Sequence, residues 1–246
     1  GQGRRNSWLL ALAGFPTATA LVRIGDGSSD AFHSRPEHMG IDCGNIANSI
    51  GIYSTNANEG SGPQEVIVER FKAKGIFFDT GGCQNWAMRG IECFHTSTSA
   101  VGIDIATSAG SNTIDDVTVN SQDGTVSTSP GIRLGASNVA LRRIHGENHA
   151  QVLQVNSVAT GSVIHISGHA TVTTVVELNQ TGFLIMDVNQ NSATNAINDL
   201  NAGGAGALSL NSGGYFFHTN DGGLALKHIL SSATAVTNRF NNPQPF

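Results

Sequence analysis

Charged side chains are scarce in this sequence. Lys, Arg, Asp and Glu make up 13% of its 246 residues, about half of the share that is usual in a soluble domain. The 13 basic and 18 acidic residues give a net charge of −5 and form no basic cluster. This balance excludes a coiled coil and a charged tail. It also predicts no binding to nucleic acid, which requires patches of Lys and Arg against the phosphates.

Long apolar runs and a cysteine framework are absent as well. The sequence contains no run of 18 apolar residues, so it predicts no transmembrane helix and no membrane partner. Cys43, Cys83 and Cys93 have neither metal-ligand nor disulfide spacing, and we expect them to be small buried residues. Scattered acidic residues do not form a calcium loop, and we expect no metal and no other cofactor.

What the sequence does contain favours β-structure. Thirty glycines lie in a background of Ser, Thr and Asn, while Val, Ile, Leu and Phe recur along the whole chain. Such regular apolar content argues against disorder. A chain of this length can bury a sizeable core, and we expect a β-rich fold with many turns.

The N-terminal residues imitate a secretion signal. Arg4 and Arg5 precede an apolar run over residues 8–13, and Ala18-Thr19-Ala20 resembles a cleavage site. The interpretation that we favour is a turn at residues 1–3 leading into a β-strand. We also expect that both ends were cut from a longer protein.

A short motif repeats along the chain. A Gly-Ile step opens residues 51–54, 75–78, 102–105 and 131–134, at intervals of 24, 27 and 29 residues, and residues 152–155 keep the pattern without the glycine. A second pattern, one apolar, two polar and one apolar residue, occurs at 36–39, 68–71, 88–91, 114–117 and 141–144. Short strands recurring every 20–30 residues predict a solenoid whose coils stack on one another.

The predicted fold is therefore all-β: a right-handed parallel β-helix over residues 1–191. Residues 192–246 have a weaker pattern and are predicted to form an irregular β segment that caps the helix or joins subunits. The register predicts one inward column, consisting of Ile52, Ile76, Ile103, Ile132 and Leu153. It also predicts a ladder of charges along one corner, in which opposite signs alternate from the second residue onward, consisting of Glu37, Glu69, Arg89, Asp115 and Arg142.

The Gly-Ile strand and the corner that follows it, repeated from about residue 21 to 190, resemble the pectin-lyase-like superfamily of parallel β-helices. That superfamily includes pectate lyases, polygalacturonases, epimerases and many phage tailspikes. The resemblance implies a polysaccharide as partner and, for a tailspike, a homotrimer. Polygalacturonases carry their catalytic carboxylates just before the Gly-Ile-type strand. Here those positions hold Ile50, Lys74, Val101 and Pro130, which departs from that branch.

The outward residues of the repeated strands form the predicted site. They are Tyr53, Phe77, Asp104, Arg133 and Gln154. Two aromatic rings beside an acid, a base and an amide suit a sugar, which stacks on rings and hydrogen-bonds to polar groups. A structural ladder, in which Asp104 and Arg133 pair across the sheet, accounts for the same residues equally well.

Loop residues before this sheet supply further titratable groups, namely Glu92, His95, Asp123, Glu147 and His149. Arg133 between Asp104 and Glu147 would serve a lyase as proton acceptor, whereas Asp104 paired with Glu147 or Asp123 would serve a hydrolase. The predicted catalytic residues are Asp104, Arg133 and Glu147. The predicted substrate-binding residues are Tyr53, Phe77, Gln154 and His149.

Three functions fit these observations. The first, which we favour, is a carbohydrate-binding or carbohydrate-cleaving domain of a phage tail fibre or tailspike that acts on a bacterial surface polysaccharide. The second is a secreted bacterial polysaccharide lyase or hydrolase. The third is a structural or adhesive fibre without catalysis. All three place the protein outside the cell or on a virion.

Overall fold

The computed structural model describes residues 7–26, 28–79, 82–136, 138–156, 159–179 and 183–189, together with three short strands beyond them. Every regular element of these residues is a β-strand. None of them forms a helix that is long and apolar enough to cross a membrane.

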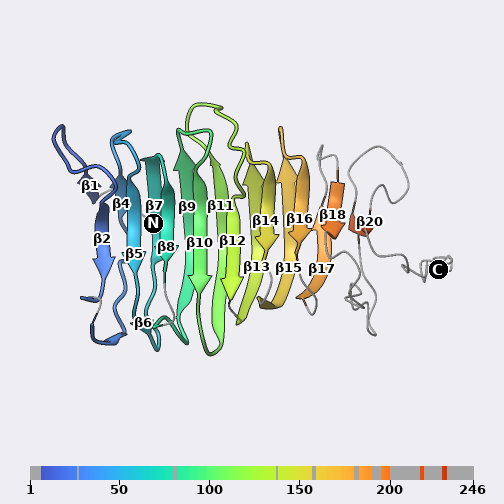
Figure 1. Ribbon diagram of the computed structural model, residues 1–246, viewed down its shortest axis with the longest axis horizontal. Helices are drawn as coiled ribbons and strands as arrows, with labels where there is room; N and C mark the ends of the chain where they lie inside the picture. Colours follow the sequence, from blue (N-terminus) through green and yellow to red (C-terminus); the bar gives the residue numbers. More distant parts are fainter. Residues whose placement is uncertain are drawn as a thin grey trace.

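Two nine-stranded sheets make up the molecule (Figure 1). Sheet A consists of β1 (Trp8–Leu10), β4 (Gly40–Asp42), β7 (Gln64–Phe71), β9 (Ala87–His95), β11 (Asn112–Ser121), β13 (Asn138–Glu147), β15 (Thr160–His169), β17 (Phe183–Asn189) and β19 (Phe217–His218). Sheet B consists of β2 (Ala20–Ile24), β5 (Ile50–Ser54), β8 (Lys74–Phe78), β10 (Val101–Thr107), β12 (Ile132–Ala136), β14 (Gln151–Val155), β16 (Thr174–Leu178), β18 (Asn195–Asp199) and β20 (Ile229–Ser231). A two-stranded sheet joins β3 (Ala31–Phe32) and β6 (Ala57–Asn58).

The chain alternates between the two large sheets, and every strand pairs in parallel with the equivalent strand one coil away. In Figure 1 the strands of sheet B point downward in front, those of sheet A point upward behind, and the chain advances from left to right. This is a right-handed coil. The predicted parallel β-helix is therefore confirmed as a β-solenoid.

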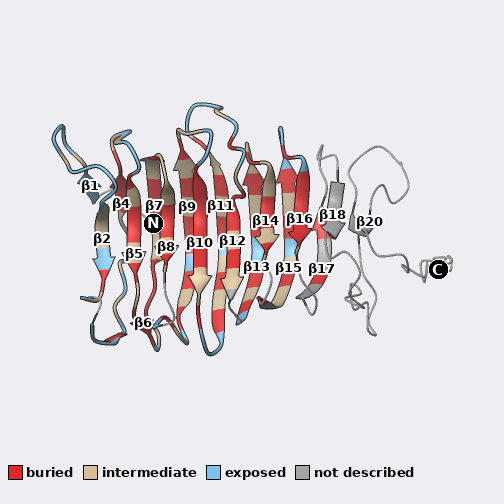
Figure 2. Ribbon diagram, in the orientation of Figure 1, coloured by how far each residue is buried: buried red, intermediate tan, exposed pale blue. Residues whose placement is uncertain are grey.

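The core is a set of aliphatic columns between the sheets. Successive strands of sheet B place the five residues of the predicted inward column directly beside one another, and all five side chains are fully buried. Figure 2 shows buried residues running along both sheets from coil to coil. The hydrophobic effect along these columns is the main force that stacks the coils.

The glycine of the Gly-Ile step has a steric cause. A Cβ added to Gly131 of sheet B would collide with the Val119 side chain of sheet A, and a Cβ at Gly102 would lie 2.7 Å from Val119 Cγ1. One coil later the sizes are exchanged. Val152 replaces the glycine in sheet B, and the facing residue is Gly146, whose added Cβ would lie 2.6 Å from Val152 Cγ1. Large and small side chains thus alternate across the core, as close packing requires.

The corner pattern marks a sharp bend inside each long strand of sheet A. The second of its two central residues has a positive φ on successive coils: His38 (53°), Glu65 (53°), Gly90 (64°), Asp116 (57°), Arg143 (51°) and His165 (57°). The prediction is correct at 36–39, 88–91, 114–117 and 141–144. It is wrong at 68–71, because the same pattern occurs at Pro63–Val66, and that segment aligns with the other corners.

The predicted charge ladder needs the corresponding correction. Gln64, rather than Glu69, lies between Glu37 and Arg89. Asp115 does lie between Arg89 and Arg142 in the register. Its ion pair, however, is made with Arg143, whose Nη2 lies 2.8 Å from Asp115 Oδ2. The positive φ of Arg143 turns that side chain along the corner toward Asp115.

The remaining fold predictions concern the cysteines and the chain ends. All three cysteines are free and buried, as expected, and burial raises the pKa of the Cys43 thiol to about 12. β1 confirms a strand near the N-terminus. Beyond residue 191, β18 and β20 extend sheet B, and β19 extends sheet A. The rest of 192–246 lies outside the described residues, so the boundary at 191 stays a prediction.

Candidate functional site

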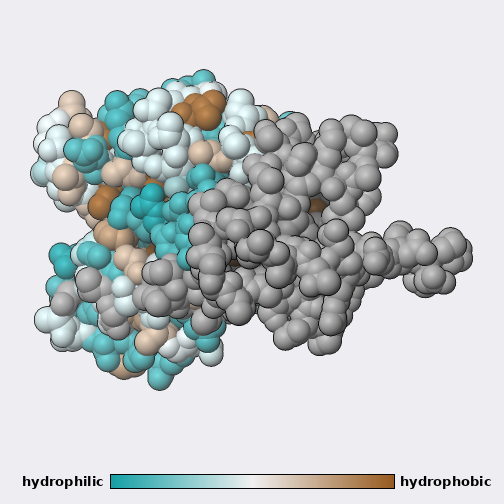
Figure 3. All heavy atoms as spheres, turned by 45° about the vertical axis from the view of Figure 1, so that its right-hand side comes forward, coloured by the Kyte–Doolittle hydropathy of each residue, from teal (hydrophilic) through white to brown (hydrophobic). Residues whose placement is uncertain are grey.

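The outward column predicted for sheet B is present in the expected register. Tyr53 pairs with Phe77, Phe77 with Asp104, Asp104 with Arg133, and Arg133 with Gln154. Arg23 precedes this row and Glu177 follows it. In Figure 3 the visible face is hollowed between an upper and a lower ridge, and hydrophilic residues cover much of it.

Asp104 is held in ion pairs within this row. The residue is 3% exposed, and its Oδ2 lies 2.8 Å from Lys74 Nζ and 3.5 Å from Arg133 Nη1. The sequence analysis did not assign Lys74 to this row. Lys74 stands two residues before Ile76 of the inward column, and the strand pattern alone does not show on which face of the sheet its side chain lies. The two cations offset the cost of burying the Asp104 charge. Its neighbours therefore give Asp104 a structural part in the sheet.

The two aromatic residues of the row, Tyr53 and Phe77, also contact neighbouring side chains. The Tyr53 and Phe77 rings lie 5.6 Å apart between centroids, at an angle of 56°. Lys74 Nζ lies 3.0 Å from the Phe77 centroid, and Arg23 lies over the Tyr53 ring at 5.3 Å. Cation–π contacts of this kind cover the ring faces that a sugar would use. At the far end of the row, Gln154 Nε2 donates to Glu177 Oε1 at 2.8 Å.

Glu147, the third predicted catalytic residue, lies elsewhere. It is on the outer face of sheet A at the end of β13, whereas Asp104 and Arg133 are on sheet B. The structure therefore does not bring the predicted catalytic triplet together. Glu147 instead accepts hydrogen bonds from Asn120 Nδ2 and His145 Nε2, both at 2.9 Å.

His149 was expected in a solvent-facing loop next to the substrate, and that expectation is wrong. Its side chain is fully buried, because the segment after β13 bends inward beneath Gly131. The His149 ring packs against His95 in a tilted arrangement, with 4.5 Å between centroids and 53° between the ring planes. Burial, together with His95, lowers the pKa of His149 to about 3.

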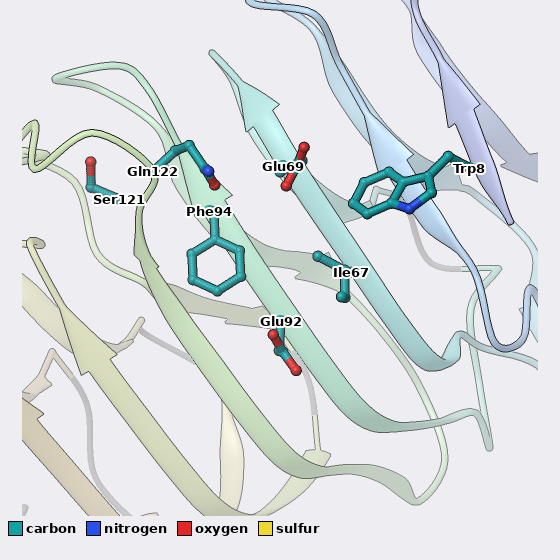
Figure 4. A pocket seen from close by; sticks show the side chains of 7 residues that line it. All are labelled: Trp8, Ile67, Glu69, Glu92, Phe94, Ser121 and Gln122. Atoms are coloured by element: carbon teal, nitrogen blue, oxygen red, sulfur yellow. The ribbon is translucent and has the colours of Figure 1, made fainter. Parts of the chain in front are cut away.

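A groove lies on the outer face of sheet A near its N-terminal end (Figure 4). Its volume is about 420 Å³, and it is lined by Trp8, Ile67, Glu69, Glu92, Phe94, Ser121 and Gln122. Ile67 and Glu69 come from β7, Glu92 and Phe94 from β9, and Ser121 from the end of β11, which Gln122 follows. Aromatic rings, carboxylates and an amide therefore share one open face.

The floor of the groove is a two-by-two pattern across adjacent strands. Ile67 pairs with Glu92, and Glu69 pairs with Phe94. The carboxylates thus occupy one diagonal, and the apolar side chains lie between them (Figure 4). A strand spacing of about 4.8 Å and a rise of about 6.6 Å over two residues place the Cα atoms of the carboxylate pair about 8 Å apart.

Trp8 forms the N-terminal wall of the groove because its neighbour on β4 has no side chain. Trp8 pairs with Gly40, and Gly40 pairs with Ile67. A Cβ added to Gly40 would collide with the indole ring. The ring therefore lies over the backbone of β4, beside the floor of the groove. Trp8 remains 38% exposed.

The surroundings of Glu69 change the pKa of its carboxyl group. Partial burial is the main cause that raises the pKa of Glu69, and the neighbouring Asp42 raises it further. Asp42 pairs with Glu69 in the register and is bound by the Arg70 guanidinium, whose Nε donates to Oδ1 at 2.7 Å. Both causes act in the direction that favours the protonated form of the Glu69 carboxyl group, and the Arg70 guanidinium opposes them.

The sequence analysis named Glu92 as a titratable residue but did not identify this groove. Among the described residues, no three His, Cys, Asp or Glu side chains are grouped so that they could hold a metal ion. The chemistry available in the groove is therefore that of rings, carboxyl groups and an amide. Compared with models of protein families, with curated proteins and with solved structures, the chain matches none.

Proposed function

We propose that the protein binds a carbohydrate in the groove on sheet A, as a β-helix of the pectin-lyase-like kind that occurs in tailspikes and tail fibres. The observation that carries the proposal is the pair of rings, Trp8 and Phe94, beside Glu69 and Glu92 in one open groove. Sugars stack their apolar faces on aromatic rings, and their hydroxyl groups hydrogen-bond to carboxylates and amides. A bacterial surface polysaccharide is the substrate class that we infer.

The groove suits this function better than the row on sheet B. The rings of that row are covered by Lys74 and Arg23, and its acid is held by two cations. The seven lining residues of the groove contain two carboxylates and no cation. This charge favours a neutral or amine-bearing glycan over an acidic one.

Truncating either ring of the groove should weaken glycan binding. We expect Trp8→Ala and Phe94→Ala each to raise the dissociation constant about tenfold, because each removes a stacking surface worth about 1 kcal/mol or more. Calorimetry with a panel of bacterial polysaccharides would first identify a binder and then compare the variants. Phe32→Ala is the matched control, because Phe32 is an exposed ring on β3 outside the groove. An equal loss in the Phe32 variant would contradict the assignment.

The raised pKa of Glu69, beside a second carboxyl group in the groove, favours a second function there, hydrolysis of the bound glycan. A glycosidase needs one protonated carboxyl to protonate the leaving oxygen and one carboxylate on the other side of the bond. Glu69 has the raised pKa that the acid requires. The catalytic carboxyl groups of glycosidases lie about 5–9.5 Å apart, a range that the diagonal of adjacent strands can provide.

Glu69→Gln should separate hydrolysis from binding. We expect the release of reducing ends to fall at least 100-fold, as is usual when a general acid is lost, while glycan affinity changes less than threefold. Glu65→Gln, a glutamate at the corner of the same strand, is the control and should leave both unchanged. If wild-type protein binds the glycan and releases no reducing ends over a day, the groove binds without cleaving.

A further inference from the structure

A second constellation lies on the same outer face of sheet A, on β13 and β15, and its Ser167 is three strands from Glu92 of the groove. Ser167 of β15 pairs in register with His145 of β13, and Glu147 follows His145 by two residues on the same face. His145 Nδ1 lies 2.8 Å from Ser167 Oγ, and His145 Nε2 lies 2.9 Å from Glu147 Oε1. A hydroxyl, an imidazole and a carboxylate are thus joined in one hydrogen-bonded line.

The partners of the imidazole fix the direction of these hydrogen bonds. The His145 hydrogen bond is the main cause that lowers the pKa of Glu147, so its carboxylate is ionised and only accepts. His145 therefore carries its proton on Nε2 and donates it to Glu147. Its Nδ1 is left as an acceptor for the Ser167 hydroxyl. The alternative acceptor for that hydroxyl, the Ile144 carbonyl, is farther away at 3.4 Å.

We propose that Ser167, His145 and Glu147 form an esterase site that removes acyl groups from sugar hydroxyls. Serine hydrolases share this order of nucleophile, base and orienting carboxylate on unrelated folds. Ser167 Oγ attacks the ester carbonyl carbon while its proton passes to His145 Nδ1. The bond from the carbonyl to the sugar oxygen then breaks, and His145 returns the proton to that oxygen.

Water completes the reaction. It attacks the acyl-Ser167 ester, again with His145 Nδ1 taking a proton, and the proton then restores the Ser167 hydroxyl as the acid is released. The net change is one ester plus one water to one alcohol plus one carboxylic acid. Glu147 acts as a positioning residue that holds the imidazole tautomer. The exposed His169, which lies 3.5 Å from Glu147 and two residues after Ser167, supplies an N–H donor on this face.

The surroundings of Ser167 indicate a small acyl group on a polar carrier. The outer face around the Ser167–His145 pair is polar, since Thr118 pairs with His145, and Asn120 and His169 contact Glu147. Glu92, Thr118, His145 and Ser167 follow one another in a single outward column. Three strand spacings of about 4.8 Å place Ser167 about 14 Å from the groove. A glycan lying along the helix axis would span both sites, so the identification of an O-acetylated glycan rests on the proposed function.

Covalent labelling tests the site without any glycan. We expect a fluorophosphonate probe to modify wild-type protein on Ser167, as located by peptide mass spectrometry, and to leave Ser167→Ala and His145→Ala unlabelled. Ser162→Ala, which removes another serine of β15, should label like wild type. Glu147→Gln should slow labelling at least tenfold, because the amide no longer orients the imidazole as the carboxylate does, whereas Glu147→Asp, which keeps a carboxylate, should slow it less.

The outcomes separate this proposal from the glycan-binding one. Two results together support the esterase, whether or not a polysaccharide binds. The probe labels Ser167, and the wild-type protein releases acetate from p-nitrophenyl acetate whereas Ser167→Ala does not. A wild-type protein that binds a polysaccharide but takes no label overturns the esterase and leaves the groove proposal intact. Equal labelling of Ser167→Ala also overturns it. Circular dichroism of each variant shows whether the fold is retained.

Discussion

Acidification from pH 7 to 4.5 should lower the free energy of unfolding by about 3 kcal/mol through His149 alone. The pKa of this buried imidazole is about 3, well below its ordinary value of 6.5. Between pH 6.5 and 3, His149 is therefore protonated in the unfolded chain and stays neutral in the folded chain. The stabilisation is complete above pH 6.5, is lost as the pH falls through this window, and changes no further below about pH 3.

The contacts of the histidine pair explain why the pKa values of both rings are lowered. His149 Nδ1–H donates to the Ser129 carbonyl at 3.2 Å, and His95 Nε2–H donates to the Asn148 carbonyl at 3.3 Å. Burial is also the main cause that lowers the pKa of His95. Two charged rings 4.5 Å apart inside the core would repel each other and lack water.

Urea unfolding at a series of pH values measures this effect. His149→Gln keeps a side-chain donor but cannot titrate, so its stability should fall less steeply between pH 6.5 and 4.5 than that of wild type. His38→Gln, at an exposed corner, should follow the wild-type curve. A His149→Gln curve parallel to wild type would show that acid acts elsewhere.

Gly131→Val should destabilise the protein by about 3 kcal/mol or more. The new side chain would enter the space of Val119, and overpacking of a close-packed core costs about 1–3 kcal/mol or more. The position has no positive φ, so the expected loss comes from packing rather than from backbone strain. The midpoint of denaturant unfolding measures it.

A double substitution identifies the cause. Val119→Gly combined with Gly131→Val recreates the arrangement of Gly146 facing Val152 one coil later. We expect the double variant to be at least about 2 kcal/mol more stable than the sum of the single effects predicts, because residues in direct contact are not additive. Strict additivity would mean that Val119 and the new valine do not compete for the same space.

Much of the fold could be predicted because the repeated residues are the ones that pack between the two sheets. The Gly-Ile step identifies the inward column correctly, since glycine is needed wherever the facing residue of sheet A is large. The error at residues 68–71 has a local cause. One coil contains two apolar–polar–polar–apolar segments, and both Glu65 and Arg70 adopt a positive φ. Only the strand pairing decides which of them aligns with the other corners.

The groove and the serine constellation depended on that same register. A shift of five residues in β7 decides whether Glu69 faces Arg89 or Phe94, so the diagonal of two carboxylates was invisible in the sequence. His145 and Glu147 could have been noticed as a His-x-Glu step on one strand face. Ser167 could not, because it meets His145 only through pairing between coils 22 residues apart. Trp8 was assigned to an apolar run, and its place over Gly40 again follows from pairing.

The exchange of sizes between Gly131 and Val152 divides the solenoid into two blocks. The blocks differ in which sheet carries the small residue of each facing pair. Before the exchange, sheet B carries the small residue and sheet A the large one. After it, the order is reversed. A duplicated or deleted coil within one block would meet a neighbour of the same kind. A coil transplanted across the division would face valine with valine or glycine with glycine. The chain can therefore lengthen or shorten by whole coils on either side of this boundary, but coils cannot be moved across it unless both facing positions change together.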